Sequence, residues 1–196
     1  MDTKQLKQKI LDLAIRGKLV PQDPNDEPAS VLLERIRAER EQLIKQGKIK
    51  RSKSTSDNQH YQNVPFEIPS SWKWMRLDDV CEINLGLTHT PVYVEEGVPF
   101  VSAKDISTSL LDLNNTKKIS YTEFETFPYG AKPHKGDVLF CRVGTIGHPQ
   151  IVTTEEQFGI FVSVGFLRLT NSAISNEYLK IWMESPLFVG QVESDV

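Results

Sequence analysis

The stretch GDVLFCRVGTIGHPQIV, residues 136–152, holds the residue types most suited to a chemical site. Arg142 and Thr145 stand beside two glycines, Gly144 and Gly147, between two apolar runs. Glycines three apart, next to a guanidinium and a hydroxyl, could cradle a phosphate, form an oxyanion site or make a tight turn. A P-loop would need Gly-x-x-x-x-Gly-Lys-Ser/Thr, and a dinucleotide fold Gly-x-Gly-x-x-Gly opening a helix. Because His-Pro and a β-branched run follow Gly147, the bend is predicted to be a strand–turn–strand connection.

The rest of the sequence contains no recognisable catalytic motif. The sequence has no Gly-x-Ser-x-Gly elbow and no Glu-x-Lys triplet of metal-dependent nucleases, and its four histidines share no metal-ligand spacing. The motif NVPF at residues 63–66 differs from the Asn-Pro-Pro-Tyr/Phe of amine methyltransferases, and no glycine-rich cofactor loop precedes it. The sequence therefore predicts no catalytic residue and no metal site, and it favours a binding module.

Two amphipathic helices are predicted at the N-terminus. Apolar residues at helical spacing predict the first over residues 3–16, stopped by Gly17, and the second over residues 28–46, stopped by Gly47. Short helices need a partner surface for an apolar stripe, and little in this segment supplies one. That surface could be the second domain, another chain or a further part of this one. The residues expected to dock a partner are Leu32, Ile36 and Leu43.

The rest of the chain predicts a linker followed by an α+β domain. Residues 48–63 are polar and read as a flexible basic-to-polar linker. From residue 64 onward, runs rich in Val, Ile and Phe alternate irregularly with short helical segments, and residues 175–185 predict a closing helix. The expected fold is α+β (mixed α/β), with one twisted mixed β-sheet and short helices.

Composition and charge narrow the class of protein. With 39% hydrophobic and 25% charged residues, no secretory signal and no long apolar stretch, the sequence is typical of a soluble cytoplasmic protein. Cys81 and Cys141 are expected to be buried thiols. The net charge of −3 hides a local +5 over residues 34–53, eight basic against three acidic. This basic stretch indicates either a polyanion or acidic partner, or a solvated helix end.

Several segments, in order, resemble the DNA-specificity (S) subunit of type I restriction–modification enzymes. They are KQKILDLAIRGKLVPQDPNDEPASVLLERIRAEREQLIKQGKIKRSK, PFEIPSSWKWMRLDDVCEI, FVSAKDI and GDVLFCRVGTIGHPQIV. The resemblance implies a helical scaffold at 1–47, a linker at 48–63 and one target-recognition domain at 64–196. It also implies that the family pattern continues past residue 196, so the sequence is expected to be part of a longer subunit or a natural half-subunit.

The resemblance further implies a non-catalytic subunit that reads one half of a bipartite DNA target. Its implied partners are double-stranded DNA, modification (methyltransferase) subunits and a restriction (translocase/nuclease) subunit, with no membrane. S-adenosylmethionine, ATP and magnesium are then expected in the partner subunits, and no cofactor in this one. The alternative is a fragment of a methyltransferase or restriction enzyme that carries its own catalysis.

DNA contacts are expected from polar residues in turns, because phosphate contacts position a reader and base-edge contacts specify the sequence. The family resemblance assigns the turn itself, through Gly144 and Gly147, a framework role, with Arg142 and Thr145 touching a phosphate. The full candidate set is Arg142, Thr145, Lys104, His148, Gln150, Lys132, His134, Lys135 and His89.

Overall fold

The chain forms two compact units. The computed structural model describes residues 2–49, 64–107, 110–143 and 147–194. The first unit comprises Met1–Cys81 with Leu169–Ile174, and the second comprises Glu82–Arg168 with Ser175–Val196. Residues 64–81 thus group with the N-terminal helices, whereas they were expected to open the recognition domain. Most of the expected linker, residues 50–63, lies outside the described residues, and the three-part division of the sequence stays a prediction.

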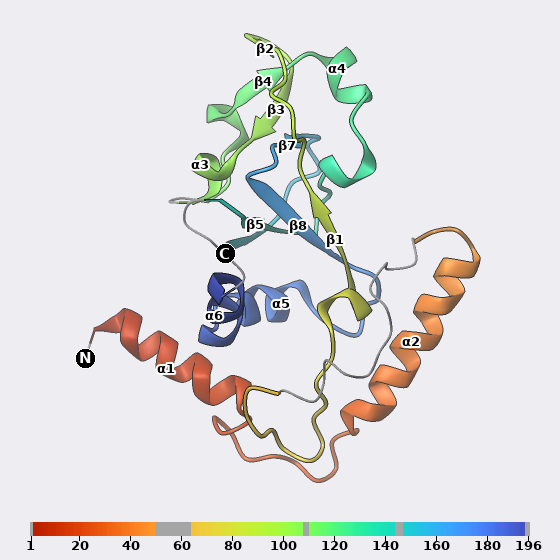
Figure 1. Ribbon diagram of the computed structural model, residues 1–196, viewed down its shortest axis with the longest axis vertical. Helices are drawn as coiled ribbons and strands as arrows, with labels where there is room; N and C mark the ends of the chain where they lie inside the picture. Colours follow the sequence, from red (N-terminus) through yellow and green to blue (C-terminus); the bar gives the residue numbers. More distant parts are fainter. Residues whose placement is uncertain (1, 50–63, 108–109, 144–146, 195–196) are drawn as a thin grey trace. The chain divides into compact units, whose positions relative to one another are not determined.

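The first unit begins with the two expected helices, α1 (Thr3–Ile15) and α2 (Ala29–Lys45) (Figure 1). The side chain of Asp2 caps the first turn of α1 by accepting the Lys4 N–H. Gly17 and Gly47, just after the two helices, have φ of 65° and 69°, a conformation that glycine adopts without a Cβ clash. Both predicted helix ends are confirmed to within about a residue.

The apolar stripe of α2 is covered within its own unit. Leu33 and Ile36 are buried with Val80, in a cluster that also holds Leu32, Met75, Leu77 and Ile174. Thr170 fixes the segment Leu169–Ile174 beside this cluster, because its N–H and its hydroxyl both donate to the Val80 carbonyl at 2.9 Å. Residues from 64 onward therefore supply the covering surface, one of the alternatives that the sequence left open, and Ile36, at 3% exposure, is not free to dock a partner.

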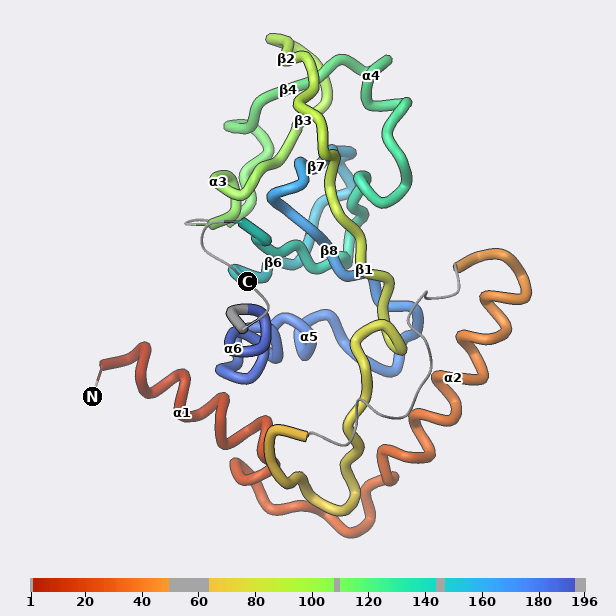
Figure 2. Tube along the Cα trace, in the orientation of Figure 1, coloured from red at the N-terminus to blue at the C-terminus, as the bar shows by residue number. Residues whose placement is uncertain are grey.

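Residues 64–76 run beside the connection between α1 and α2 (Figure 2). The Arg16 guanidinium lies 4.3 Å from the centre of the Phe66 ring. The Trp72 indole N–H donates to Gln22 at 2.8 Å, far along the chain. Within the first unit this segment has no regular helix or strand, and the 3₁₀ turn Leu77–Asp79 follows it.

The described residues of the second unit carry two four-stranded sheets, not the single mixed sheet expected. The first has the order β1-β8-β5-β6 and the second the order β2-β4-β3-β7. Their bounds are β1 Cys81–Leu85, β2 Tyr93–Val94, β3 Val98–Val101, β4 Lys117–Ile119, β5 Val138–Cys141, β6 Gly147–Ile151, β7 Gly159–Ile160 and β8 Val164–Leu169.

Both sheets are consistent with the expected α+β class. In the first, β5 is antiparallel to β6 and β8, and in the second β3 is antiparallel to β4 but parallel to β7. Among the described residues of this unit, the sheets are accompanied by the short helices α3 (Ala103–Ile106), α4 (Tyr121–Glu125), α5 (Asn176–Met183) and α6 (Pro186–Ser194). The closing helix is confirmed as α5, whereas α6 was not predicted.

One core connects the two sheets. Leu139, Cys141 and Phe166 on one face of the first sheet are fully buried with Val101 and Ile160 from the second. Antiparallel pairing of Leu139 with Phe166 places these side chains on the same face. Each large apolar side chain buried here contributes about 1.5–3 kcal/mol, so this core fixes the turns that leave its edges.

Candidate nucleic-acid interface

The bend between β5 and β6 is a strand–turn–strand connection, as predicted. β5 is antiparallel to β6, with Cys141 opposite Gly147 at the end of the pairing. Gly144 and Thr145 lie outside the described residues. Arg142 and His148, each one residue from that last pair, are both exposed and flank the base of the turn. Two of the candidate DNA contacts are therefore brought to one end of the first sheet.

Ser163 ties this end of the sheet to α3. Its carbonyl accepts the Arg142 N–H at 2.9 Å, and its hydroxyl accepts the Ala103 N–H at 3.1 Å. The Arg142 side chain donates to the Val162 carbonyl at 3.2 Å. The Cys141 thiol also donates to the Ala103 carbonyl at 3.7 Å, and burial raises the pKa of this thiol. These bonds hold the first turn of α3 beside the end of β5.

Lys104 follows Ala103 in α3 and is exposed. The neighbouring acid, Asp105, is occupied in a capping box, where it accepts the Ser102 N–H at 2.8 Å and its hydroxyl at 2.7 Å. Lys104 thus joins Arg142 and His148 around the turn. We call these three residues the turn cluster. Sequence reasoning missed Ser163, because a lone serine inside an apolar run carries no signal of its role.

Gln150 is engaged inside the protein. Its amide donates to the Ile106 carbonyl at 2.7 Å, and its side-chain oxygen accepts the Leu111 N–H at 2.7 Å. Both ends of the amide are therefore used to hold the segment after α3 against β6. These two bonds favour a structural role for Gln150 over a contact with a base edge.

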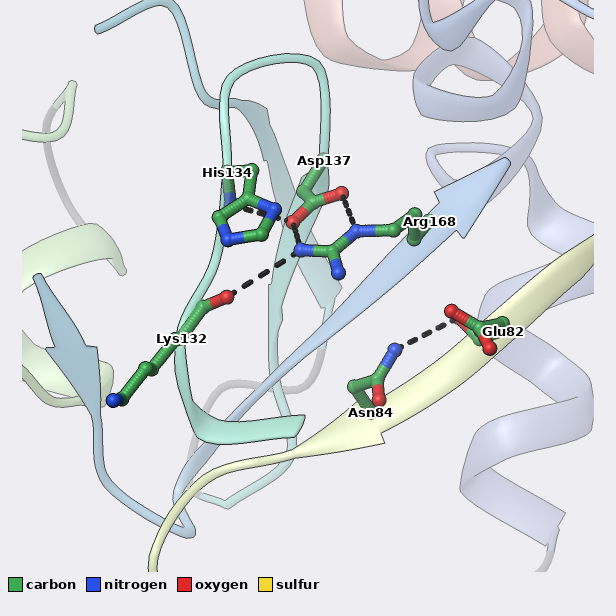
Figure 3. Close-up of polar contacts among 6 residues, drawn as sticks. All are labelled: Glu82, Asn84, Lys132, His134, Asp137 and Arg168. Carbon is green, nitrogen blue, oxygen red and sulfur yellow. Dashed lines mark hydrogen bonds and ion pairs between the residues drawn. The ribbon is translucent and has the colours of Figure 1, made fainter. Parts of the chain in front are cut away.

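A second group of candidates surrounds an ion pair between Asp137 and Arg168 (Figure 3). Arg168 donates to Asp137 through Nε at 2.8 Å and through Nη2 at 2.6 Å, and the Asp137 side chain is only 3% exposed. The same carboxylate accepts the His134 backbone N–H at 2.7 Å. Arg168 Nη2 also donates to the Lys132 carbonyl at 3.4 Å. The pair therefore fixes the segment from Lys132 to Asp137.

Electrostatics around this pair follow from its burial. Burial alone would lower the pKa of Arg168, but its bonds with Asp137 and its interaction with Tyr129 outweigh that and raise it. The guanidinium lies 4.4 Å from the Tyr129 ring centre and 5.0 Å from that of Phe166. Burial and the neighbouring charge of Arg168 lower the pKa of His134.

The remaining candidates are dispersed. Lys132 lies 4.6 Å from the centre of the Phe124 ring and donates to the Glu125 carbonyl at 3.3 Å. Lys135 pairs with Glu155 at 3.0 Å, and His89 is exposed in the connection after β1. The structure thus separates the candidates into the turn cluster, the Lys132–Asp137 segment and His89.

Because the second unit is acidic overall, its ability to attract DNA depends on where its basic side chains lie. By sequence, the second unit has 8 basic and 14 acidic residues, a net −6, and the first has 15 basic and 12 acidic residues, a net +3. An acidic domain attracts a polyanion only where cations are gathered and acids are absent or occupied. At the turn cluster, Lys104 and Arg142 supply two positive charges, while the Asp105 carboxylate keeps its charge and is bonded to Ser102.

Across the ranges given above, no three His, Cys, Asp or Glu side chains come together as a metal site. In the same ranges, no helix combines the length and the apolarity needed to cross a bilayer.

The fold and the turn cluster define an α+β protein with a candidate nucleic-acid-binding edge. The chain is homologous to specificity subunits of type I restriction enzymes. It is 33% identical over 203 residues to the EcoAI specificity subunit of Escherichia coli, across 98% of this chain and 33% of that one. It is 49% identical over 105 residues to the EcoEI specificity subunit of Escherichia coli, across 54% of this chain and 17% of that one.

The chain spans about one third of the length of the EcoAI relative. The similarity to the EcoAI and EcoEI specificity subunits confirms the resemblance found in the sequence. A crystal structure of the HsdS subunit from Thermoanaerobacter tengcongensis is similar at 19% identity with a TM-score of 0.48, covering 79% of this chain and 38% of that one. No protein-family profile matches the chain.

Proposed function

We propose that this chain is the DNA-recognition part of a type I restriction–modification specificity subunit, reading one half of a bipartite target without catalysing a reaction. The observation that carries the proposal is the homology to the EcoAI specificity subunit across 98% of the chain. The turn cluster supplies a physical means, because exposed cations at the end of a rigid sheet are suited to phosphate contacts.

Arg142 and Lys104 are the proposed phosphate contacts. Ser163 holds the backbone of Arg142 and of Ala103, the residue before Lys104, so little loop ordering remains when DNA binds. Each phosphate neutralised releases a counterion, which makes the affinity fall with salt. The proposal therefore includes a salt-dependent affinity despite the net −6 of the second unit.

The partners and cofactors follow from the same proposal. Modification subunits would methylate adenine with S-adenosylmethionine, and a restriction subunit would use ATP and magnesium to translocate and cleave DNA. The complex would act in the cytoplasm, where the DNA lies. This chain would hold none of these cofactors.

A segment exchange tests the proposal. Residues 82–196 are replaced by those of a related specificity subunit, with Thr170 and Ile174 retained because they pack in the first unit. The chimera, completed by the rest of the subunit and its modification subunits, is expressed in cells, and methylated adenines are mapped across the genome. We expect one half of the target to change to the donor's sequence and the other half to persist. Methylation confined to the original target would refute the proposal.

A further inference from the structure

His148 has a backbone conformation that is unfavourable for its residue type. Its φ is 48°, and it is the one described non-glycine residue with positive φ. This conformation is energetically unfavourable for an L-residue, because it brings the Cβ too close to the following carbonyl oxygen. Pro149 comes next, and a residue before proline is further restricted. A glycine would adopt this backbone without that penalty.

A β-bulge accounts for the conformation. Leu139 pairs with Gln150 and Cys141 with Gly147, so two steps along β5 are matched by three along β6. His148 lies within this irregular stretch and is exposed, whereas Gly147 and Pro149 on either side are buried. Bulges of this kind re-aim a side chain.

The surrounding structure holds the bulge in place. Gln150 fixes the far side through its two bonds to Ile106 and Leu111, each at 2.7 Å. Gly147, with φ of 99°, fixes the near side opposite the buried Cys141. An unfavourable backbone conformation persists where its surroundings over-determine it in this way, often at a binding site.

Among the described residues, the His148 side chain makes no polar or ring contact that would offset this cost. Within the described residues no hydrogen bond, ion pair or ring contact involves its imidazole, which is exposed. The imidazole offers an N–H donor and, when neutral, an acceptor, the two groups that base edges require.

We infer that His148 is a specificity-determining residue, which contacts a base edge in the major groove while Arg142 beside it contacts the phosphate backbone. This inference rests on the proposed DNA-recognition function. The two residues flank the Cys141–Gly147 pair, so a duplex contacted by one is within reach of the other. A base contact specifies the sequence, and a phosphate contact positions the reader.

The test compares His148→Gly and His148→Asn with the unchanged chain. Glycine removes the imidazole and relieves the backbone, and asparagine tolerates positive φ while offering an amide. Each purified protein selects duplexes from a randomised library, and its thermal unfolding midpoint is measured. Thr153→Ala, an exposed change just after β6, is the matched control.

For His148→Gly we expect an equal or higher midpoint, together with a preference at one base pair that falls at least about fivefold. For His148→Asn we expect a different base to be preferred at that position. Unchanged selection by both variants would overturn the inference while leaving the proposed function standing. A lower midpoint with unchanged selection would do the same, since it would show a structural role. If the unchanged chain itself selects no sequence, both the inference and the proposed function are wrong.

Discussion

Asp137 and Arg168 meet through two parallel hydrogen bonds in the interior of the second unit, at 2.8 Å and 2.6 Å. The two residues are far apart in the sequence: Asp137 lies just before β5, and Arg168 lies on β8. Arg168 also donates to the Lys132 carbonyl, and Asp137 accepts the His134 backbone N–H. It therefore joins a strand of the first sheet to the segment that carries three candidate residues.

Breaking this pair from one side should be costly. Asp137→Ala leaves a mostly buried guanidinium unpaired, and we expect it to lower the free energy of unfolding of the second unit by about 3–5 kcal/mol. Urea unfolding at neutral pH measures the loss. The matched control is Glu155→Ala, which breaks the exposed pair with Lys135 and should cost under about 1 kcal/mol. Similar losses for the two variants would contradict this account.

His134 should make stability depend on pH. Its pKa is lowered in the folded state, so the unfolded chain binds the proton more readily. Stability is then present above about pH 6.5, the ordinary histidine pKa, and is lost as the pH falls below it toward the folded pKa. His134→Gln should reduce the difference in unfolding free energy between pH 7.5 and pH 5. An unchanged difference would show that other groups cause it.

Gln150 should prove structural. Gln150→Leu keeps the approximate size but leaves the Ile106 carbonyl and the Leu111 N–H without this partner, and we expect a loss of about 1–3 kcal/mol. The slope of DNA affinity against salt should stay the same, since no phosphate contact is removed. Unchanged stability combined with weaker DNA binding would reverse this assignment.

Arg142 should act on all DNA sequences alike. Arg142→Ala is expected to weaken binding uniformly and to lower the salt slope by about one. Lys180→Ala on α5 removes the same charge from a residue outside the turn cluster and should leave the slope unchanged. A loss confined to the preferred sequence would instead make Arg142 a base reader.

The two helices of the first unit should respond differently to an added charge. Ile36 is 3% exposed, so Ile36→Asp should destabilise the first unit itself, and it is not a clean test of partner docking. Leu6 and Ile10 of α1 are 43% and 42% exposed, and changing both to Asp should leave the unit folded. Loss of binding to modification subunits in a pull-down would support docking through α1, and retained binding would exclude it.

Local signals explain what could be predicted from the sequence. The ends of α1 and α2 depend on glycines and spacing within a few residues, and the turn after β5 depends on Gly147 and its neighbours. Long-range pairings carry no such signal. Gln150 reads as a polar residue in a strand, and only the fold brings Ile106 and Leu111 to its amide.

The errors have the same origin. β2 and β7 are two residues long, too short for an alternating pattern, so a second sheet was not foreseen. The cover over α2 comes partly from Ile174, which is distant in sequence from Leu33 and Ile36. For the site, Arg142 and Lys104 were named as candidates, but the bonds from Ser163 to Arg142 and to Ala103, the residue before Lys104, carry no sequence signal.

The two hydrogen bonds from Thr170 to the Val80 carbonyl close a loop of chain that contains the strands of both sheets. The chain leaves the first unit after Cys81 and returns to it at Leu169, so the two ends of this loop are held next to each other. The entropy of closing such a loop grows only with the logarithm of its length. A foreign insert of quite different size could occupy the loop at little cost to the helices, provided that its two ends meet at the distance of one hydrogen bond.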